Sequence, residues 1–111
     1  MRSQTEVDHF VPWSFYSSDL GHNFVLAHRE CNSARRDLLA SENHLASWVE
    51  RNRAHGQALE GEFDRLRVLH SLSSTMRIAR WAYSSVSSAS GLTWKAKDNL
   101  VPLTSEWDRL L

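Results

Sequence analysis

The chain has 111 residues, of which 41% are hydrophobic and 23% charged, and its formal net charge at pH 7 is zero. These values are typical of one globular domain and exclude a disordered tail, while the neutral balance gives no indication of a nucleic-acid partner. No apolar run approaches the ~20 residues that span a bilayer, and the single cysteine, Cys31, cannot form an internal disulfide, so we expect a cytoplasmic protein without a membrane segment.

The first 40 residues predict two short strands followed by a helix. The sequence TEVDHFV is β-branched and aromatic enough for a strand that ends before Pro12. A polar loop containing Gly21 follows, and NFVLAH then predicts a second strand. The good helix formers of SARRDLLA come after two plausible caps, so we expect a helix to begin at Asn32 or Ser33.

Residues 41–111 predict a mainly helical part that packs on the first 40 residues, so that the whole chain forms one structural domain of the α+β class. Ser41 is a suitable cap for a helix that Gly56 would end, and periodic apolar positions predict two more helices. NLVPL is expected to be extended, and TSEWDRLL to form a last helical turn. The side chains expected to pack against the first part are Trp48, Phe63, Leu66 and Trp81.

Adjacent acidic and imidazole side chains stand in the first predicted strand, at Asp8 and His9. Burying both without partners would cost several kcal/mol, so the pair either faces solvent at the strand end or takes part in chemistry. Consecutive strand residues point to opposite faces, and only a strand end would let one reach a metal and the other a substrate. Two further polar residues follow in order, Asn23 and Asn32, although singly they are an ordinary turn residue and an ordinary helix cap.

Together these residues carry a resemblance. VDHFVPWS…HNFVLAHRECNSARR, from Val7 to about Arg36, resembles the motif of HNH endonucleases, which fold as a ββα-metal finger. The Asp-His pair, the proline three residues later and the two asparagines appear in the family's order. The segment is especially similar to a zinc-free subgroup that includes the HNH domain of CRISPR RNA-guided nucleases and restriction-like bacterial proteins, which suggests a role in bacterial defence or restriction.

The resemblance implies a role for each of these four residues. His9 matches the general base, and Asp8 and Asn32 match the metal ligands. Their oxygen atoms suit Mg²⁺, for which we expect Mn²⁺ to substitute. Asn23 matches a residue that ties down the loop, so that a loop carbonyl orients the imidazole of His9.

Three arginines near the predicted helix are candidates for contact with nucleic acid. Arg35 stands where the family often has a lysine or arginine, and Arg29 and Arg36 lie close to it in the sequence, although for Arg36 we favour a position facing solvent over contact with substrate. A separate pair, His28 and Cys31, falls where zinc-bearing HNH proteins have a cysteine pair. Because a closed zinc site needs four protein ligands and no second pair has this spacing, we expect no structural zinc and a buried Cys31.

The function implied by the resemblance is a Mg²⁺-dependent endonuclease that hydrolyses DNA phosphodiester bonds. One site per chain would nick one strand, leaving 5′-phosphate and 3′-hydroxyl ends, and the sequence does not separate RNA from DNA as substrate. The alternative is a non-catalytic nucleic-acid-binding or interaction module that retains the HNH scaffold. The neutral charge is consistent with a nuclease that takes its affinity for DNA from an upstream recognition region or a partner protein.

Overall fold

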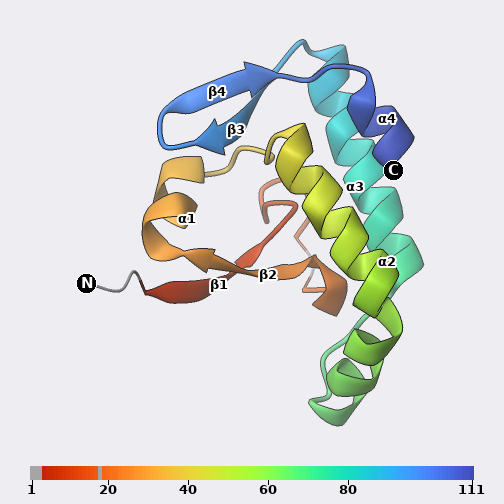
Figure 1. Ribbon diagram of the computed structural model, residues 1–111. Helices are drawn as coiled ribbons and strands as arrows, with labels where there is room; N and C mark the ends of the chain where they lie inside the picture. Colours follow the sequence, from red (N-terminus) through yellow and green to blue (C-terminus); the bar gives the residue numbers. More distant parts are fainter. Residues whose placement is uncertain (1–3, 18) are drawn as a thin grey trace.

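The computed structural model describes residues 4–17 and 19–111, and Figure 1 shows a β-hairpin beside a group of helices, with a second hairpin above it. This combination of strands and helices confirms the predicted α+β class. The elements in chain order are β1 (Thr5–His9), the 3-10 turn η1 (Gly21–Asn23), β2 (Phe24–His28), α1 (Arg29–Arg35), α2 (Glu42–Arg65), α3 (Leu72–Ser88), β3 (Leu92–Ala96), β4 (Asn99–Pro102) and α4 (Glu106–Leu110).

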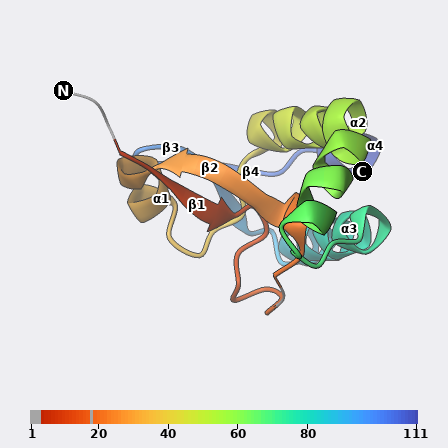
Figure 2. The ribbon, with the colours of Figure 1, turned by 90° about the horizontal axis from the view of Figure 1, so that it is seen from below.

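The first hairpin confirms both predicted strands. β1 and β2 pair antiparallel, with Asp8 opposite Val25 and His9 opposite Phe24. Figure 2 shows this hairpin running between α1 at one end and the helices α2 and α3 at the other. The end of β1 that carries Asp8 and His9 therefore lies toward the middle of the molecule.

The start of the first helix differs from the prediction. α1 begins at Arg29, directly after β2, and Asn32 lies inside the helix rather than at its N-cap. The main-chain N–H of Arg29 donates to the carbonyl of Gln4 over 2.8 Å, which continues the hairpin pairing to the first helical residue. The strand pairing therefore sets where the helix begins, and the cap preference of asparagine has no part in it.

The end of α1 also differs from the prediction, because residues 37–40 are not helical. The helix ends at Arg35, and Arg36 adopts a positive φ of 55° that an α-helix cannot contain. The following segment instead pairs with β3: the carbonyl of Leu39 accepts from Trp94 N–H over 2.9 Å, and Ser41 N–H donates to the Trp94 carbonyl over 2.8 Å. β3, which the sequence analysis did not predict, thus holds the connection between α1 and α2.

The second helix begins as predicted but continues past its expected end. Ser41 is the N-cap residue of α2, and the helix runs unbroken through Gly56 to Arg65. At Gly56 the helix approaches other elements closely: a Cβ there would lie 3.2 Å from Leu72, and the Gly56 carbonyl accepts a 3.1 Å hydrogen bond from His22 Nε2. Glycine here allows close packing, and that packing offsets the ~1 kcal/mol lost in helix propensity.

The C-terminal elements agree more closely with the sequence analysis. Of the two further helices predicted, the one that contains Leu59 and Phe63 is wrong as a separate element, because these residues belong to α2. The other helix, the extended NLVPL segment and the final helical turn are confirmed as α3, β4 and α4. The N-cap residue of α3 is Ser71, whose hydroxyl oxygen accepts from Ser74 N–H over 3.2 Å. Serine satisfies a free N–H at this position, as it does at many helix starts.

The core joins the N-terminal hairpin to α2. The ring of Phe10, directly after β1, stacks on Trp48 of α2 with centroids 4.4 Å apart and planes 7° apart. The fully buried Tyr83 of α3 donates from its hydroxyl to the carbonyl of Ala40 over 2.5 Å. Burial raises the pKa of the Tyr83 phenol, which therefore stays a neutral donor.

Two of the four side chains expected to pack against the N-terminal part do so. Trp48 stacks on Phe10, and Phe63 lies edge-on to His22 with ring centroids 5.2 Å apart. Leu66 and Trp81 are instead 59% and 52% exposed, so the prediction was wrong for both. Leu66 lies at the C-terminal cap of α2, and Trp81 lies on the side of α3 opposite its buried face.

Arg51 of α2 fastens the turn η1 to the helix. Its guanidinium donates to the carbonyls of Phe24 and His22 over 2.7 and 2.6 Å, and to Oδ1 of Asn52. Burial lowers the pKa of Arg51, but an arginine remains charged in proteins, so its hydrogen bonds are charge-assisted. Trp48 Nε1 donates to the same His22 carbonyl over 3.1 Å. The segment that leads into β2 is therefore held from two successive turns of α2.

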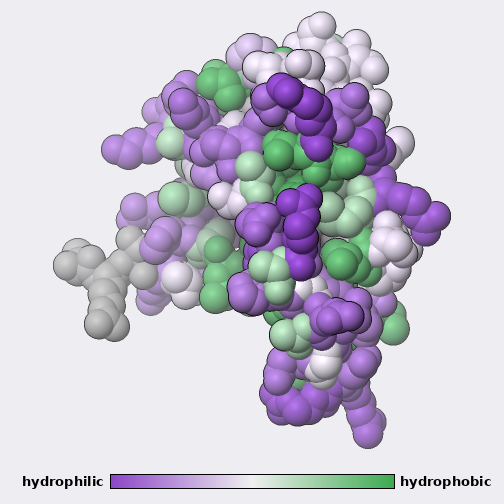
Figure 3. Space-filling model, turned by 45° about the vertical axis from the view of Figure 1, so that its right-hand side comes forward, coloured by the Kyte–Doolittle hydropathy of each residue, from purple (hydrophilic) through white to green (hydrophobic). Residues whose placement is uncertain are grey.

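Hydrophilic side chains cover much of the surface. In Figure 3 the hydrophilic side chains surround hydrophobic ones gathered near the middle of the face shown. Hydrophilic side chains also make up most of the lower end, where α2 ends and α3 begins. Among the residues that the structure describes, no helix combines the length and apolar character required to cross a membrane.

The two glycines at residues 21 and 61 predict opposite effects of the same substitution. A Cβ at Gly21 would lie 2.6 Å from the ring of Phe63, whereas one at Gly61, on α2, would meet nothing within 4 Å. We expect Gly21→Ala to lower the free energy of unfolding by about 1–3 kcal/mol through overpacking, and Gly61→Ala to raise it by about 1 kcal/mol. Urea denaturation measures both, and equal effects would contradict the close contact between η1 and α2.

Candidate active site

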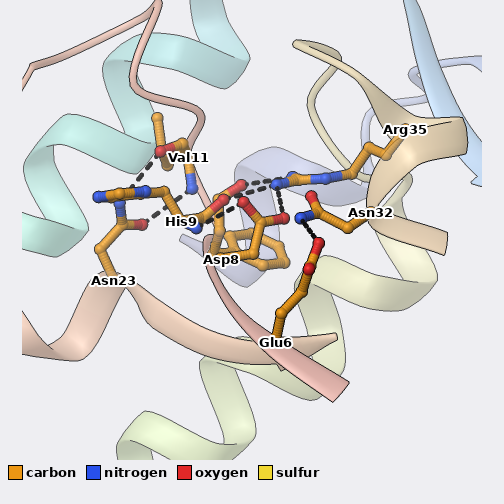
Figure 4. A network of polar contacts seen from close by, with 8 residues as sticks. Glu6, Asp8, His9, Val11, Asn23, Asn32 and Arg35 are labelled. Carbon is orange, nitrogen blue, oxygen red and sulfur yellow. Dashed lines mark hydrogen bonds and ion pairs between the residues drawn. The ribbon is translucent and has the colours of Figure 1, made fainter. Parts of the chain in front are cut away.

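Asp8 and His9 lie at the end of β1, where their side chains leave on opposite faces of the hairpin. Asp8 faces α1, and its Oδ1 accepts the main-chain N–H of His9 over 2.7 Å. Figure 4 shows the Asp8 carboxylate between the main chain of His9 and the side chains that α1 contributes, Asn32 and Arg35. The two adjacent residues thus form two neighbouring polar environments, one between hairpin and helix and one on the outer face.

Arg35 of α1 connects the helix to the end of β1 through several hydrogen bonds. Its Nη2 donates to Asp8 Oδ2 and to the carbonyl of His9, each over 2.6 Å, and its Nη1 donates to the carbonyl of Phe10 over 2.8 Å. The side chain is only 7% exposed. Because these three acceptors engage the guanidinium inside the protein, Arg35 fits a structural role and not the predicted contact with nucleic acid.

Asn32 faces the hairpin from the second turn of α1. Its Nδ2 donates to Oε1 of Glu6 over 2.6 Å, and its Oδ1 has no hydrogen-bond partner among residues 4–17 and 19–111. Glu6 and Asp8 are two residues apart in β1 and so project from the same face of the strand. Glu6 therefore orients the Asn32 amide beside Asp8, with the amide oxygen left free.

The sequence analysis missed Glu6 as a member of this group. The signal was present in the period of two along β1, which puts Glu6 and Asp8 on one face. The second carboxylate oxygen of Glu6 lies 3.6 Å from Nε of Arg29, which is largely exposed. Arg29 thus reaches the edge of the site, whereas Arg36 is exposed just beyond the end of α1.

Asn23 ties the loop after β1 to the start of β2. Its Oδ1 accepts from Val11 N–H over 2.8 Å, its Nδ2 donates to the Val11 carbonyl over 3.0 Å, and its own carbonyl accepts from Phe10 N–H over 2.7 Å. The residue is 8% exposed. These contacts fix the backbone that follows His9, and nothing in them brings the Asn23 side chain into the chemistry itself.

His9 lies on the outer face of the hairpin with a quarter of its side chain exposed. Its ring packs against Phe24 and the edge of Trp13, with centroids 5.2 and 5.7 Å away. The polar partner of the ring is a carboxylate, Asp19 Oδ1, 2.7 Å from Nε2. The family resemblance implied a loop carbonyl in this place, and Asp19 was not among the predicted site residues.

A cleft of about 440 Å³ lies beside the Asp8–Arg35 pair. Residues of β2, α1 and α2 line it, together with the aromatic side chains of Phe10, Trp48 and Trp94. Asp8 and Arg35 both line it, so the ion pair forms part of the wall of this cleft.

The donors that would hold Mg²⁺ are the oxygens of Asp8 and Asn32. Each oxygen of the Asp8 carboxylate accepts one hydrogen bond here, which leaves a second lone pair on each for an ion. The free Oδ1 of Asn32 is a neutral oxygen donor of the kind that Mg²⁺ accepts. The donor set therefore fits a hard divalent cation, with Glu6 adding negative charge next to it and Arg35 opposing it.

Among the residues that the structure describes, no group of three or more His, Cys, Asp or Glu side chains is arranged to hold a metal ion of any kind. The absence of a structural zinc stays a prediction. Cys31 is exposed and not buried as expected, and it lies within α1, which begins three or four residues earlier than predicted.

Comparison with known proteins gives one result for the N-terminal part. Residues 1–41 match a family model described as HNH endonuclease. No curated protein and no solved structure matches the chain significantly. The match covers less than half of the chain and contains all four residues of the predicted motif.

The contacts of Arg35 predict that removing it destabilises the fold. We expect Arg35→Ala to lower the free energy of unfolding by about 3–5 kcal/mol, because Asp8 loses its partner inside the protein. The matched control is Arg36→Ala, an exposed neighbour, for which we expect a change within about 0.5 kcal/mol. Denaturant titration followed by circular dichroism measures both, and equal stabilities would contradict the structural role of Arg35.

Proposed function

We propose that this protein is a metal-dependent endonuclease that hydrolyses phosphodiester bonds in DNA. The observation that carries the proposal lies at the end of β1, within a segment that matches HNH endonucleases. The Asp8 carboxylate and the Asn32 amide lie between β1 and α1, and the His9 imidazole follows on the other face of the same strand end. Each supplies one part of phosphodiester hydrolysis, namely a proton acceptor and oxygen ligands for a cation.

His9 is the general base in this proposal. Its imidazole takes a proton from a water molecule, whose oxygen forms a bond to the phosphorus while the bond to the 3′-oxygen breaks. The products are a 5′-phosphate and a 3′-hydroxyl, the latter after the leaving oxygen takes a proton from solvent. Asn23 keeps the backbone after His9 in place through its two hydrogen bonds to Val11.

Asp8 and Asn32 would hold Mg²⁺, with Mn²⁺ as a substitute. The ion would supply positive charge at the phosphate and at the leaving oxygen. Glu6 orients the Asn32 amide through the 2.6 Å hydrogen bond, and Arg35 orients the Asp8 carboxylate. We propose no structural zinc, in keeping with the zinc-free subgroup that the motif resembles.

One site per chain would cut one strand, so the expected activity is nicking. The exposed Arg29 and Arg36 are the remaining candidates for phosphate contacts near the site. With a net charge of zero, the chain has little electrostatic affinity of its own for DNA, and we propose that another region or a partner protein supplies it. Hydrolysis of this kind needs no 2′-hydroxyl, so RNA is the second substrate to test.

Cleavage of supercoiled plasmid in the presence of Mg²⁺ or Mn²⁺ tests the proposal. We expect the wild-type protein to produce nicked circles, EDTA to stop the reaction, and His9→Ala to reduce the rate by about 10²–10⁴-fold. His70→Ala is the matched control, because His70 forms a similar exposed contact with Asp64 and is not a residue of the motif. A folded wild-type protein as inactive as His9→Ala would favour the non-catalytic module instead.

Titration with Mn²⁺, followed by isothermal calorimetry in the absence of DNA, tests the metal ligands independently of activity. We expect Asp8→Ala and Asn32→Ala to remove measurable binding, and Glu6→Ala to weaken it by about 10-fold through loss of the oriented amide. Glu30→Ala, an exposed acidic position on α1, serves as the control. Equal binding by all variants would place the ion elsewhere and contradict this ligand assignment.

A further inference from the structure

The geometry points to Asp19 as a positioning residue for His9. Its carboxylate accepts a hydrogen bond from His9 Nε2 and leaves Nδ1 as the nitrogen that takes the proton from the attacking water. This inference rests on the proposed function, because it concerns which atom of His9 acts as the base. Nothing in the sequence motif assigns a role to Asp19.

The chemistry of the contact determines which nitrogen carries the proton. Asp19 Oδ1 and His9 Nε2 are 2.7 Å apart, the usual length of a charge-assisted hydrogen bond. An ionised carboxylate can only accept, so the proton between them belongs to Nε2. A neutral imidazole with its proton on Nε2 has its lone pair on Nδ1.

The other ring nitrogen of His9, Nδ1, is the one proposed to accept the proton. Within residues 4–17 and 19–111, Nδ1 of His9 has no hydrogen-bond partner, and the side chain is a quarter exposed. Phe24 and Trp13 contact the ring without offering it an acceptor on that side. The ring is thus held by two aromatic side chains and one carboxylate, and Nδ1 is the nitrogen left without a partner among the described residues.

No other acidic side chain near the motif can replace Asp19 in this role. Asp8 leaves β1 on the opposite face, where both of its oxygens accept hydrogen bonds from Arg35 and from the His9 main chain. Glu6 lies on that same face and holds Asn32. Asp19 therefore contacts the imidazole on one face of β1, whereas Asp8 and Glu6 lie on the other face, at the proposed cation site.

The chain contains a natural control for this contact. His70 Nε2 and Asp64 Oδ1, at the end of α2 and beyond, are also 2.7 Å apart, and the histidine is similarly exposed. Substitution of Asp64 removes the same kind of contact from a histidine that has no part in the proposed site. The pair Asp19→Ala and Asp64→Ala thus separates a local effect on His9 from a general effect on the protein.

Long-range ¹H–¹⁵N correlation spectra of the full chain test the proposal without substrate or metal. At about pH 8, where an ordinary imidazole is neutral, we expect His9 to show a protonated Nε2 and an unprotonated Nδ1. Asp19→Ala should convert His9 to a mixture of tautomers, Asp19→Asn should retain the pattern through its amide oxygen, and Asp64→Ala should alter His70 alone. A wild-type His9 with its proton on Nδ1, or no change in Asp19→Ala, would overturn the inference.

The nicking reaction gives a second readout. We expect Asp19→Ala to lower kcat by about 10-fold with little change in KM, and Asp19→Asn to recover part of the loss. A higher kcat in Asp19→Ala would mean that Asp19 blocks Nε2, and would overturn the assignment of Nδ1. A wild-type protein without cleavage would contradict the proposed function, and the spectra would still decide whether Asp19 sets the tautomer.

Discussion

The guanidinium of Arg35 is the contact on which the geometry at the end of β1 depends. It binds two successive main-chain carbonyls, those of His9 and Phe10, and the carboxylate of Asp8. One side chain from α1 therefore sets the course of the strand as it ends and the direction of the acidic group that precedes it. Because Phe10 stacks on Trp48, this contact also connects the hairpin to the core that α2 builds.

The predicted elements agree with the structure where a local pattern decides the conformation. β-branched and aromatic runs predicted both N-terminal strands, and Ser41 marked the start of α2. The wrong predictions lie where contacts with a distant segment of the chain determine the backbone conformation. Gly56 continues a helix because His22 and Leu72 pack against it, and the chain from Leu39 to Ser41 is not helical because it pairs with β3. Neither partner can be identified from the local sequence.

In the candidate site too, residues within a local pattern could be predicted, whereas residues positioned by distant contacts could not. The motif identified Asp8, His9, Asn23 and Asn32, and the hairpin and α1 bring them to one end of β1. Their chemical roles stay predictions. Glu6 could have been found from the alternation along the strand, whereas Asp19 comes from an irregular loop whose path no periodicity describes. Arg35 was identified as important for the wrong reason, because its burial depends on the acceptors that the folded hairpin presents to it.

The pairing of β3 with the segment between α1 and α2 limits how far the N-terminal segment can be treated as a portable unit. Residues 1–41 match the family, but Leu39 and Ser41 form main-chain hydrogen bonds with Trp94, some fifty residues later in the chain. An excised finger would leave these polar groups unpaired and would expose the ring of Phe10, which Trp48 covers. Transfer of this finger to another scaffold would therefore have to include a replacement for both contacts.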